Sequence, residues 1–307
     1  MRRLSREAWE RARSFLGERA RPIDHALFEY TFEEGERESV LRVLATYQNS
    51  DGGFGNALEP DVRLPASSVV ATVTALQILR GLEVGADHPM VAGAVRFLLE
   101  GYREDLEGWL LVPKEVDDFP RAPWWDYERN ARSPIRVNPG AEILGHLYRY
   151  SELVPDDGFL EKLAHRTRSH LLGISEDVGP DALLCCSRLV ETVQVPPSVR
   201  EPIQEKLIEL GGRAVSRDPT LWSSYSAKPL KLAPLPDSVL GVSLADEVAL
   251  NLDYEIEHQS EDGSWSPNWS WGDRFPEDWK RAEQEWKGEL TLRTLESLHA
   301  HGRLDPG

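Results

Sequence analysis

A short pattern occurs twice in this chain and constrains the fold more strongly than any other feature of the sequence. The stretch YQNSDGGFG at positions 47–55 returns as HQSEDGSWS at positions 258–266. Both copies place Gln, Asp, Gly and an aromatic residue at the same spacing, and both follow a segment with helical periodicity. A degenerate third copy, FLLEGYREDLEGWLL at positions 97–111, keeps a Gly–Trp pair after an amphipathic segment. A unit repeated in this way predicts an array of helical hairpins.

The residue types of the pattern suit the loop of a helical hairpin. Such a loop must end one helix, reverse the chain and start the next helix. Glycine supplies the backbone angles of a sharp reversal, and Gln or Asp can bond the unpaired groups at helix ends. The aromatic side chain would fill the gap between adjacent hairpins. A β-turn between two strands is disfavoured, because no segment longer than a few residues alternates apolar and polar residues.

Apolar residues recur at helical spacing along most of the chain, which predicts an all-α protein with about twelve helices. Two helices are expected within 5–33, and the others around 40–47 and at 67–82, 88–102, 138–150, 157–172, 180–194, 197–211, about 243–258, near 276–286 and at 288–303.

Composition and charge exclude several classes of protein. The 307 residues carry a formal net charge of -17, which disfavours binding to nucleic acid or to an anionic membrane surface. No stretch approaches the roughly 18 consecutive apolar residues of an integral membrane segment. The first residues are charged throughout and lack the apolar core of a signal peptide. Cys185 and Cys186 are adjacent and poorly placed to form a disulfide, so a cytoplasmic location is expected. No feature indicates a protein partner.

The repeated segments resemble the QW-type repeats of the terpenoid cyclase and protein prenyltransferase superfamily. The final stretch EWKGELTLRTLESLHAHGR also resembles the closing repeat of that family. The resemblance is clear at 36–82, 88–111 and 250–301. It implies an α/α toroid of about six helical hairpins, with inner and outer rings of helices, as a single domain over residues 1–307. It also implies an enzyme that acts on an isoprenoid or a similar small apolar molecule.

The family's prenyltransferases bind zinc through Asp, Cys and His. Here Asp181 and Cys185 are four residues apart and several histidines exist, but their spacing does not reproduce that set. His165 and His170 are poorly placed to share one helix face, and cysteines on an apolar helix are typical of a core. We therefore expect no metal and no cofactor.

The class II cyclases of the family start their reaction with a proton from the central acid of an Asp-x-Asp-Asp motif. The chain has Glu115-Val116-Asp117-Asp118 in the stretch PKEVDDFP. The resemblance implies Asp117 as the catalytic acid, with Asp118 and Glu115 as its neighbours. Such an acid must stay protonated near neutral pH, which a dry site and nearby carboxylates achieve. The alternative is a solvated acidic loop.

Aromatic and acidic residues outside this motif suggest a substrate pocket, because aromatic faces can stabilise cations or stack on sugars. We expect the candidate residues to gather with 115–118 at one mouth of the toroid. They are Trp124, Trp125, Asp126, Glu59, Asp61, Trp269 and Trp271. The aromatic residues could instead plug the end of the fold. Two function classes follow. The first is an enzyme that acts on an apolar substrate, for which the resemblance implies acid-initiated cyclisation. The second is a non-catalytic or carbohydrate-active toroid that binds a ligand in its central cavity.

Overall fold

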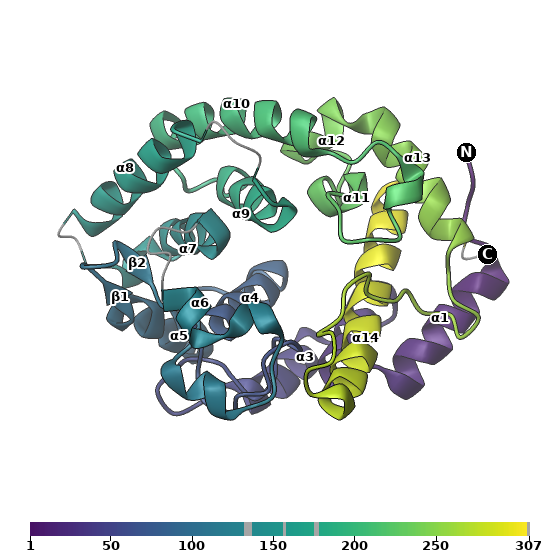
Figure 1. Cartoon of the computed structure of the whole chain (residues 1–307), viewed down its shortest axis with the longest axis horizontal. Coiled ribbons are helices and arrows are strands. Elements are labelled where there is room, and N and C mark those ends of the chain that lie inside the picture. Colours follow the sequence, from purple (N-terminus) through teal and green to yellow (C-terminus); the bar gives the residue numbers. More distant parts are fainter. Residues whose placement is uncertain (132–136, 156–157, 175–177, 306–307) are drawn as a thin grey trace. The chain divides into compact units, whose positions relative to one another are not determined.

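The computed structural model describes residues 1–131, 137–155, 158–174 and 178–305. Within these residues the chain forms fourteen α-helices and one pair of two-residue strands, which confirms the all-α class (Figure 1). The chain divides into two compact units. We call Tyr47–Ala214 the central unit, and Met1–Thr46 together with Val215–Gly307 the terminal unit. Each unit is described by itself, and the toroidal domain over 1–307 stays a prediction.

The central unit is built from three helical hairpins. The first helix of each hairpin packs on the second, the first helices α4, α7 and α9 contact one another in that order, and α8 contacts α10. First and second helices therefore form two layers, as an array of hairpins requires. The helices are α4 (Val69–Gly81), α5 (Pro89–Glu100), α7 (Val137–Arg149), α8 (Phe159–Leu172), α9 (Pro180–Val190) and α10 (Pro197–Ala214).

Short elements fill the connection between the second and third of these six helices. Strands β1 (Tyr102–Arg103) and β2 (Gly108–Trp109) pair antiparallel in the degenerate third copy of the repeat. The one-turn elements η2 (Lys114–Asp118), η3 (Pro123–Trp125) and α6 (Tyr127–Ala131) follow, and they contain half of the predicted site residues.

The terminal unit combines both ends of the chain. Its long helix α14 packs on α1 and α2, while α13 packs on α11 and α12. Leu4 N donates a hydrogen bond to Arg303 O at 2.8 Å, and the buried Arg303 guanidinium donates to Asp253 at 2.7 Å. The helices are α1 (Arg6–Arg19), α2 (Pro22–Phe32), α3 (Arg37–Leu44), α11 (Pro229–Leu232), α12 (Val239–Ser243), α13 (Ala245–Glu257) and α14 (Pro276–Ala300).

Two expectations about helices need correction. Residues 276–300 form one helix of 25 residues, whereas the sequence predicted two helices. Gly288, at the expected break, stays helical and allows close packing, since a Cβ there would lie 2.9 Å from the Ala20 Cβ. The short helices α6, α11 and α12 were not predicted, because one turn is too short to show periodicity.

The glutamines of the two repeat loops make the same pair of hydrogen bonds. Each side-chain amide donates to a carbonyl of its own loop and to a carbonyl in the first turn of another helix. The acceptors are Gly52 O (2.9 Å) and Met90 O (3.2 Å) for Gln48, and Gly263 O (2.9 Å) and Ala8 O (2.8 Å) for Gln259. In both units the glutamine thus ties the loop to a neighbouring helix.

The loop glycines are required by the backbone. The φ angle is 89° at Gly52 and 88° at Gly263, a left-handed conformation that favours glycine. A Cβ at Gly52 would lie 2.6 Å from Gly93 O, and one at Gly263 would lie 2.4 Å from Arg11 O. Any larger residue would therefore push the loop away from the helix beneath it.

The aromatic residues complete the match. Phe54 N donates to Thr72 Oγ1 at 3.0 Å, and Trp265 N donates to Thr291 Oγ1 at 3.1 Å. These contacts confirm the prediction that the two copies occupy equivalent loops. In the third copy Trp109 still donates through Nε1 to a carbonyl of the preceding helix, as Trp265 does, but the loop is the β1–β2 hairpin.

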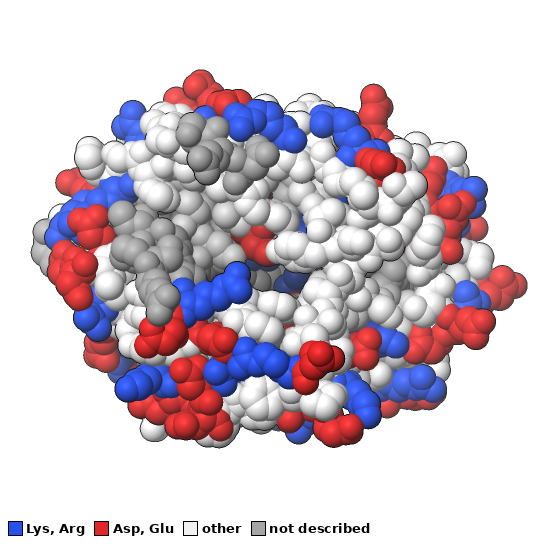
Figure 2. Space-filling model, in the orientation of Figure 1, with Lys and Arg blue, Asp and Glu red and all other residues white. Residues whose placement is uncertain are grey.

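Charged side chains of both signs lie interspersed along α8 and α10 on the face shown in Figure 2. Lys206 on α10 pairs with Glu209 at 3.0 Å, and Lys162 on α8 pairs with Glu104 at 2.8 Å. None of the helices in the described part of the chain has the length and apolar character needed to cross a bilayer.

Candidate functional site

In the central unit, the structure brings together the two segments that hold most of the predicted site. Arg63 N donates to Pro120 O at 3.0 Å, and Ala122 N donates to Asp61 O at 2.9 Å. The loop with Glu59 and Asp61 therefore lies directly beside residues 115–128, as predicted from the sequence.

Arg121 is the centre of this loop pair. Its side chain is 7% exposed and pairs with Asp117 at 2.7 Å and Asp126 at 2.8 Å. The same guanidinium donates to three backbone carbonyls of the turn, at 3.0–3.2 Å: those of Val116, Asp117 and Phe119. Arg121 thus fixes the shape of the loop and uses two of the predicted site carboxylates to do so.

The surroundings of Asp117 differ from those of a proton-donating acid. Its side chain is 40% exposed, pairs with Arg121 and accepts a hydrogen bond from Tyr127 N at 3.1 Å. Glu115 and Asp118 are exposed. A carboxylic acid that stays protonated near neutral pH needs burial without a cationic partner. The role of Asp117 as the catalytic acid gains no support from this geometry.

Most of the predicted aromatic residues are packed against other side chains. Trp125 lies against a small apolar core that includes Val62 and Val116. In the terminal unit, Trp271 is buried against Trp279, with ring centroids 5.7 Å apart, and Trp269 meets Trp286 edge to face at 5.1 Å. Trp124 is half-buried, and its carbonyl accepts from the buried Asn130 side chain at 3.0 Å. These contacts give the rings a packing role within each unit. Whether the loops of the two units share one mouth stays a prediction.

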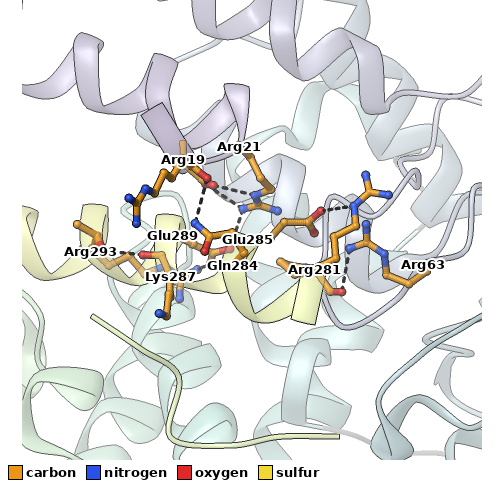
Figure 3. Close-up of polar contacts among 12 residues, drawn as sticks. Arg19, Arg21, Arg63, Arg281, Gln284, Glu285, Lys287, Glu289 and Arg293 are labelled. Carbon is orange, nitrogen blue, oxygen red and sulfur yellow. Dashed lines mark hydrogen bonds and ion pairs between the residues drawn. The ribbon is translucent and has the colours of Figure 1, made fainter. Parts of the chain in front are cut away.

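The sequence analysis missed a second set of charged residues, on α14. Its members follow one another at spacings of four, four and three, so they share one face of the helix. They are Glu285, Glu289, Arg293 and Glu296. Glu289 accepts from Arg21 at 3.0 Å and pairs with Arg293 (Figure 3).

Arg21, the N-cap residue of α2, also binds the carboxylate of Asp24 in the first turn of that helix. It donates to both carboxylate oxygens of the buried Asp24, each at 2.8 Å. Burial raises the pKa of Asp24, Arg21 opposes that shift, and Glu289 adds to it. Arg21 therefore links two carboxylates from α2 and α14.

Glu296 differs from the other acids on this face. It is half-buried, and the described residues provide it with no hydrogen bond or ion pair. Burial raises the pKa of Glu296 to about 7, Arg293 opposes the shift and Glu289 adds to it. A carboxyl of this kind can hold or release a proton near neutral pH, as a general acid must.

The central unit contains a different buried cluster between α7 and α9. Glu142, which is 2% exposed, accepts from Arg188 at 2.8 Å and lies 3.6 Å from His146 Nε2 and 3.5 Å from Cys185 Sγ. Burial acts to raise the pKa of Glu142, but Arg188 and His146 outweigh it and lower the value to about 2. Glu142 is therefore a permanent anion in the helix layer.

The cysteines show no sign of metal-binding or nucleophilic chemistry. Burial raises the pKa of Cys186 to about 12, and burial with Glu142 raises that of Cys185 well above its usual value. Thiols in this state are protonated, whereas metal ligands and nucleophiles are thiolates. Across the described ranges, no three His, Cys, Asp or Glu side chains are grouped so as to hold a metal ion. That no zinc is bound stays a prediction.

A comparison of the chain with protein-family models, curated proteins and solved structures finds no match. The function must therefore be argued from the side chains themselves.

Proposed function

We propose that the protein is an enzyme that protonates a small apolar, isoprenoid-like substrate, with Glu296 as its general acid. The observation that carries this proposal is the state of Glu296: a half-buried carboxyl without an ion pair in the described structure, whose pKa is raised to about 7. General acids work best when their pKa lies near the operating pH. Glu296 meets this condition, and Asp117 is held instead by Arg121.

The neighbouring carboxylate supports the proposal. Glu289 lies two helical turns before Glu296 and is paired with both Arg21 and Arg293. Two carboxyls in such different surroundings, one without an ion pair among the described residues and one between two arginines, suit different roles, a division seen where acid and base roles are separated.

In the proposed reaction, the Glu296 carboxylic acid gives its proton to one carbon of a substrate alkene. The two π electrons form the new C–H bond and leave a cation on the other alkene carbon. A second alkene of the same molecule closes the ring, and loss of a proton to the Glu296 carboxylate restores the acid. Aromatic faces can stabilise such cations, and the resemblance of the repeats to terpenoid cyclases also favours this chemistry.

A binding function without chemistry is the second candidate. It is favoured by the structural use of the predicted loop residues, since Asp117 and Asp126 are both held by Arg121. In that case the protein would bind an apolar molecule or a carbohydrate and release it unchanged.

Turnover separates the two candidates. The protein is incubated with linear isoprenoids and their terminal epoxides, and the products are analysed by gas chromatography with mass spectrometry. We expect cyclised products from the wild type, and at least a hundredfold loss of turnover in Glu296→Gln, because an amide has no acidic proton to give. The matched control is Glu277→Gln, on the same helix, where the side chain is 81% exposed.

The outcomes are distinct. Full turnover by Glu296→Gln would show that another group donates the proton. Saturable binding of an isoprenoid or a sugar to the wild type without conversion would establish the binding function instead.

A further inference from the structure

Three neighbouring helices of the central unit each carry an arginine in the last turn. They are Arg80 on α4, Arg149 on α7 and Arg188 on α9. Since α7 contacts both α4 and α9, the three side chains can meet, and the Arg80 guanidinium donates to Arg188 O at 3.0 Å. A cation near a helix C-terminus is favourable on its own, so the arginines alone do not define a site.

The charge of this arginine cluster is not balanced by its own carboxylates. Glu142 pairs with Arg188, and Glu191 acts on both Arg80 and Arg188. Burial lowers the pKa of Arg80, and Arg149 and Arg188 lower it further, whereas the two glutamates oppose the shift. Among the residues that the structure describes, three guanidinium groups therefore face two carboxylates, which leaves one positive charge in a chain that is acidic as a whole.

Several buried polar groups on α7 and α9 make no hydrogen bond to the described residues. Both ring nitrogens of His146 are buried and make none within the described structure, where Nε2 lies 3.6 Å from Glu142 Oε1, and the residue is 1% exposed. Arg149 Nε and Ser187 Oγ are likewise buried without a hydrogen bond there. Burial lowers the pKa of His146, and Arg80 and Arg188 lower it further against Glu142, so the ring is neutral at pH 7. Buried polar groups normally have partners, and each exception calls for an explanation.

We propose that the cluster of Arg80, Arg149, Arg188 and His146 binds the carboxylate group of a small molecule. One negative charge matches the single excess positive charge of the cluster. A planar carboxylate also suits guanidinium groups, which bind it through two parallel N–H bonds. Arg149 Nε would donate to one of its oxygens, so that this buried donor gains a partner.

This proposal does not rest on Glu296, because its residues belong to α4, α7 and α9 and none belongs to α14. It also needs no metal. Its occupant is a monoanion, since a doubly charged group would leave the cluster with a net negative charge.

Nuclear magnetic resonance of the arginine Nε–Hε groups tests the proposal directly. Sodium acetate is titrated into the wild type at constant ionic strength, with chloride as the replaced anion. The Arg149 signal, identified by its absence in Arg149→Gln, should shift in a saturable way. The matched control is Arg168 on α8, an exposed arginine of the same unit, whose signal should not shift.

Three results decide the matter. In Arg149→Gln, acetate should bind at least tenfold more weakly, as judged from the remaining signals of the cluster, whereas Arg168→Gln should bind it like the wild type. No saturable shift in the wild type would overturn the proposal, and this outcome does not depend on any variant folding. Tighter binding of inorganic phosphate than of acetate would overturn the assignment to a carboxylate.

Discussion

The pKa of Glu296 lies above that of an ordinary glutamate, and the pKa of Glu142 lies below it. Burial raises the pKa of Glu296 to about 7, whereas Arg188 and His146 overcome burial and lower that of Glu142 to about 2. One pKa unit corresponds to about 1.4 kcal/mol, so each shift amounts to about 3 kcal/mol between the two protonation states. The consequences for the pH dependence of stability have opposite signs.

Glu296 should destabilise the protein as the pH rises. Its folded pKa lies above the unfolded value, so the folded state keeps the proton that the unfolded state has lost between about pH 4.5 and pH 7. We expect Glu296→Gln to exceed the wild type by up to about 3 kcal/mol in free energy of unfolding at pH 8, and to differ little at pH 4.5. Urea unfolding at both pH values checks this, and a difference that does not change with pH would contradict it.

Glu142 should stabilise the protein, and its contribution should be present above about pH 4.5 and lost as the pH falls towards 2, because its folded pKa is the lower one. At pH 7, Glu142→Gln leaves Arg188 without its buried anion, which we expect to cost about 3–5 kcal/mol. The double variant Glu142→Gln with Arg188→Met should recover part of that loss in chemical unfolding. An equal or larger loss in the double variant would argue against the ion pair as the cause.

At the scale of elements, the repeat loops could be predicted because the residues that define each loop lie close together in the sequence. Gln48 and Gly52 are four residues apart and bond each other, and the equivalent pair in the other loop is spaced identically. The longer helices could be predicted for a similar reason, since periodicity lies within one segment. The packing role of Gly288 could not, because it depends on Ala20 in a different helix.

Long-range partners explain what was missed in the site. The proximity of Asp61 to residues 115–128 was expected, but the control of Asp117 by Arg121 was not. On α14, charged residues at helical spacing are typical of a solvated face. Glu289 accepts a hydrogen bond from Arg21, which is 268 positions away in the sequence. No local pattern reveals such a pair.

The loop glycine provides a test at this scale. We expect Gly263→Ala to destabilise the terminal unit by about 2 kcal/mol or more, because φ is 88° and the new Cβ would meet Arg11 O at 2.4 Å. Gly17→Ala, inside α1 with nothing within 4 Å of the new Cβ, should be neutral or stabilising by up to about 1 kcal/mol. Thermal unfolding of both variants measures the contrast. Similar effects of the two substitutions would show that the position of the Gly263 Cβ is not the cause of the loss of stability.

At the scale of the whole molecule, the acidic character of the chain leaves few places for an anion. The net charge is -17, and on the face shown in Figure 2 acidic and basic side chains are interspersed along α8 and α10. The arginine cluster therefore stands out by its surroundings as much as by its own charge. An anion that approaches the protein is repelled by the long-range field and retained by the hydrogen bonds and the positive charge of the cluster. Salt screens the exposed charges more than the buried cluster, so moderate salt should strengthen the binding of the anion.

The terminal unit is discontinuous, since Met1–Thr46 and Val215–Gly307 belong to it and Leu4 bonds Arg303. On the ribosome this imposes an order of events. Helices α1 and α2 emerge first but must wait for α14, which is synthesised after everything it packs against. The central unit can close in the meantime, because all its hairpins are local. Until α14 is synthesised, the faces of α1 and α2 that pack on it stay uncovered, so we expect this part of the nascent chain to be more exposed to aggregation than the central unit.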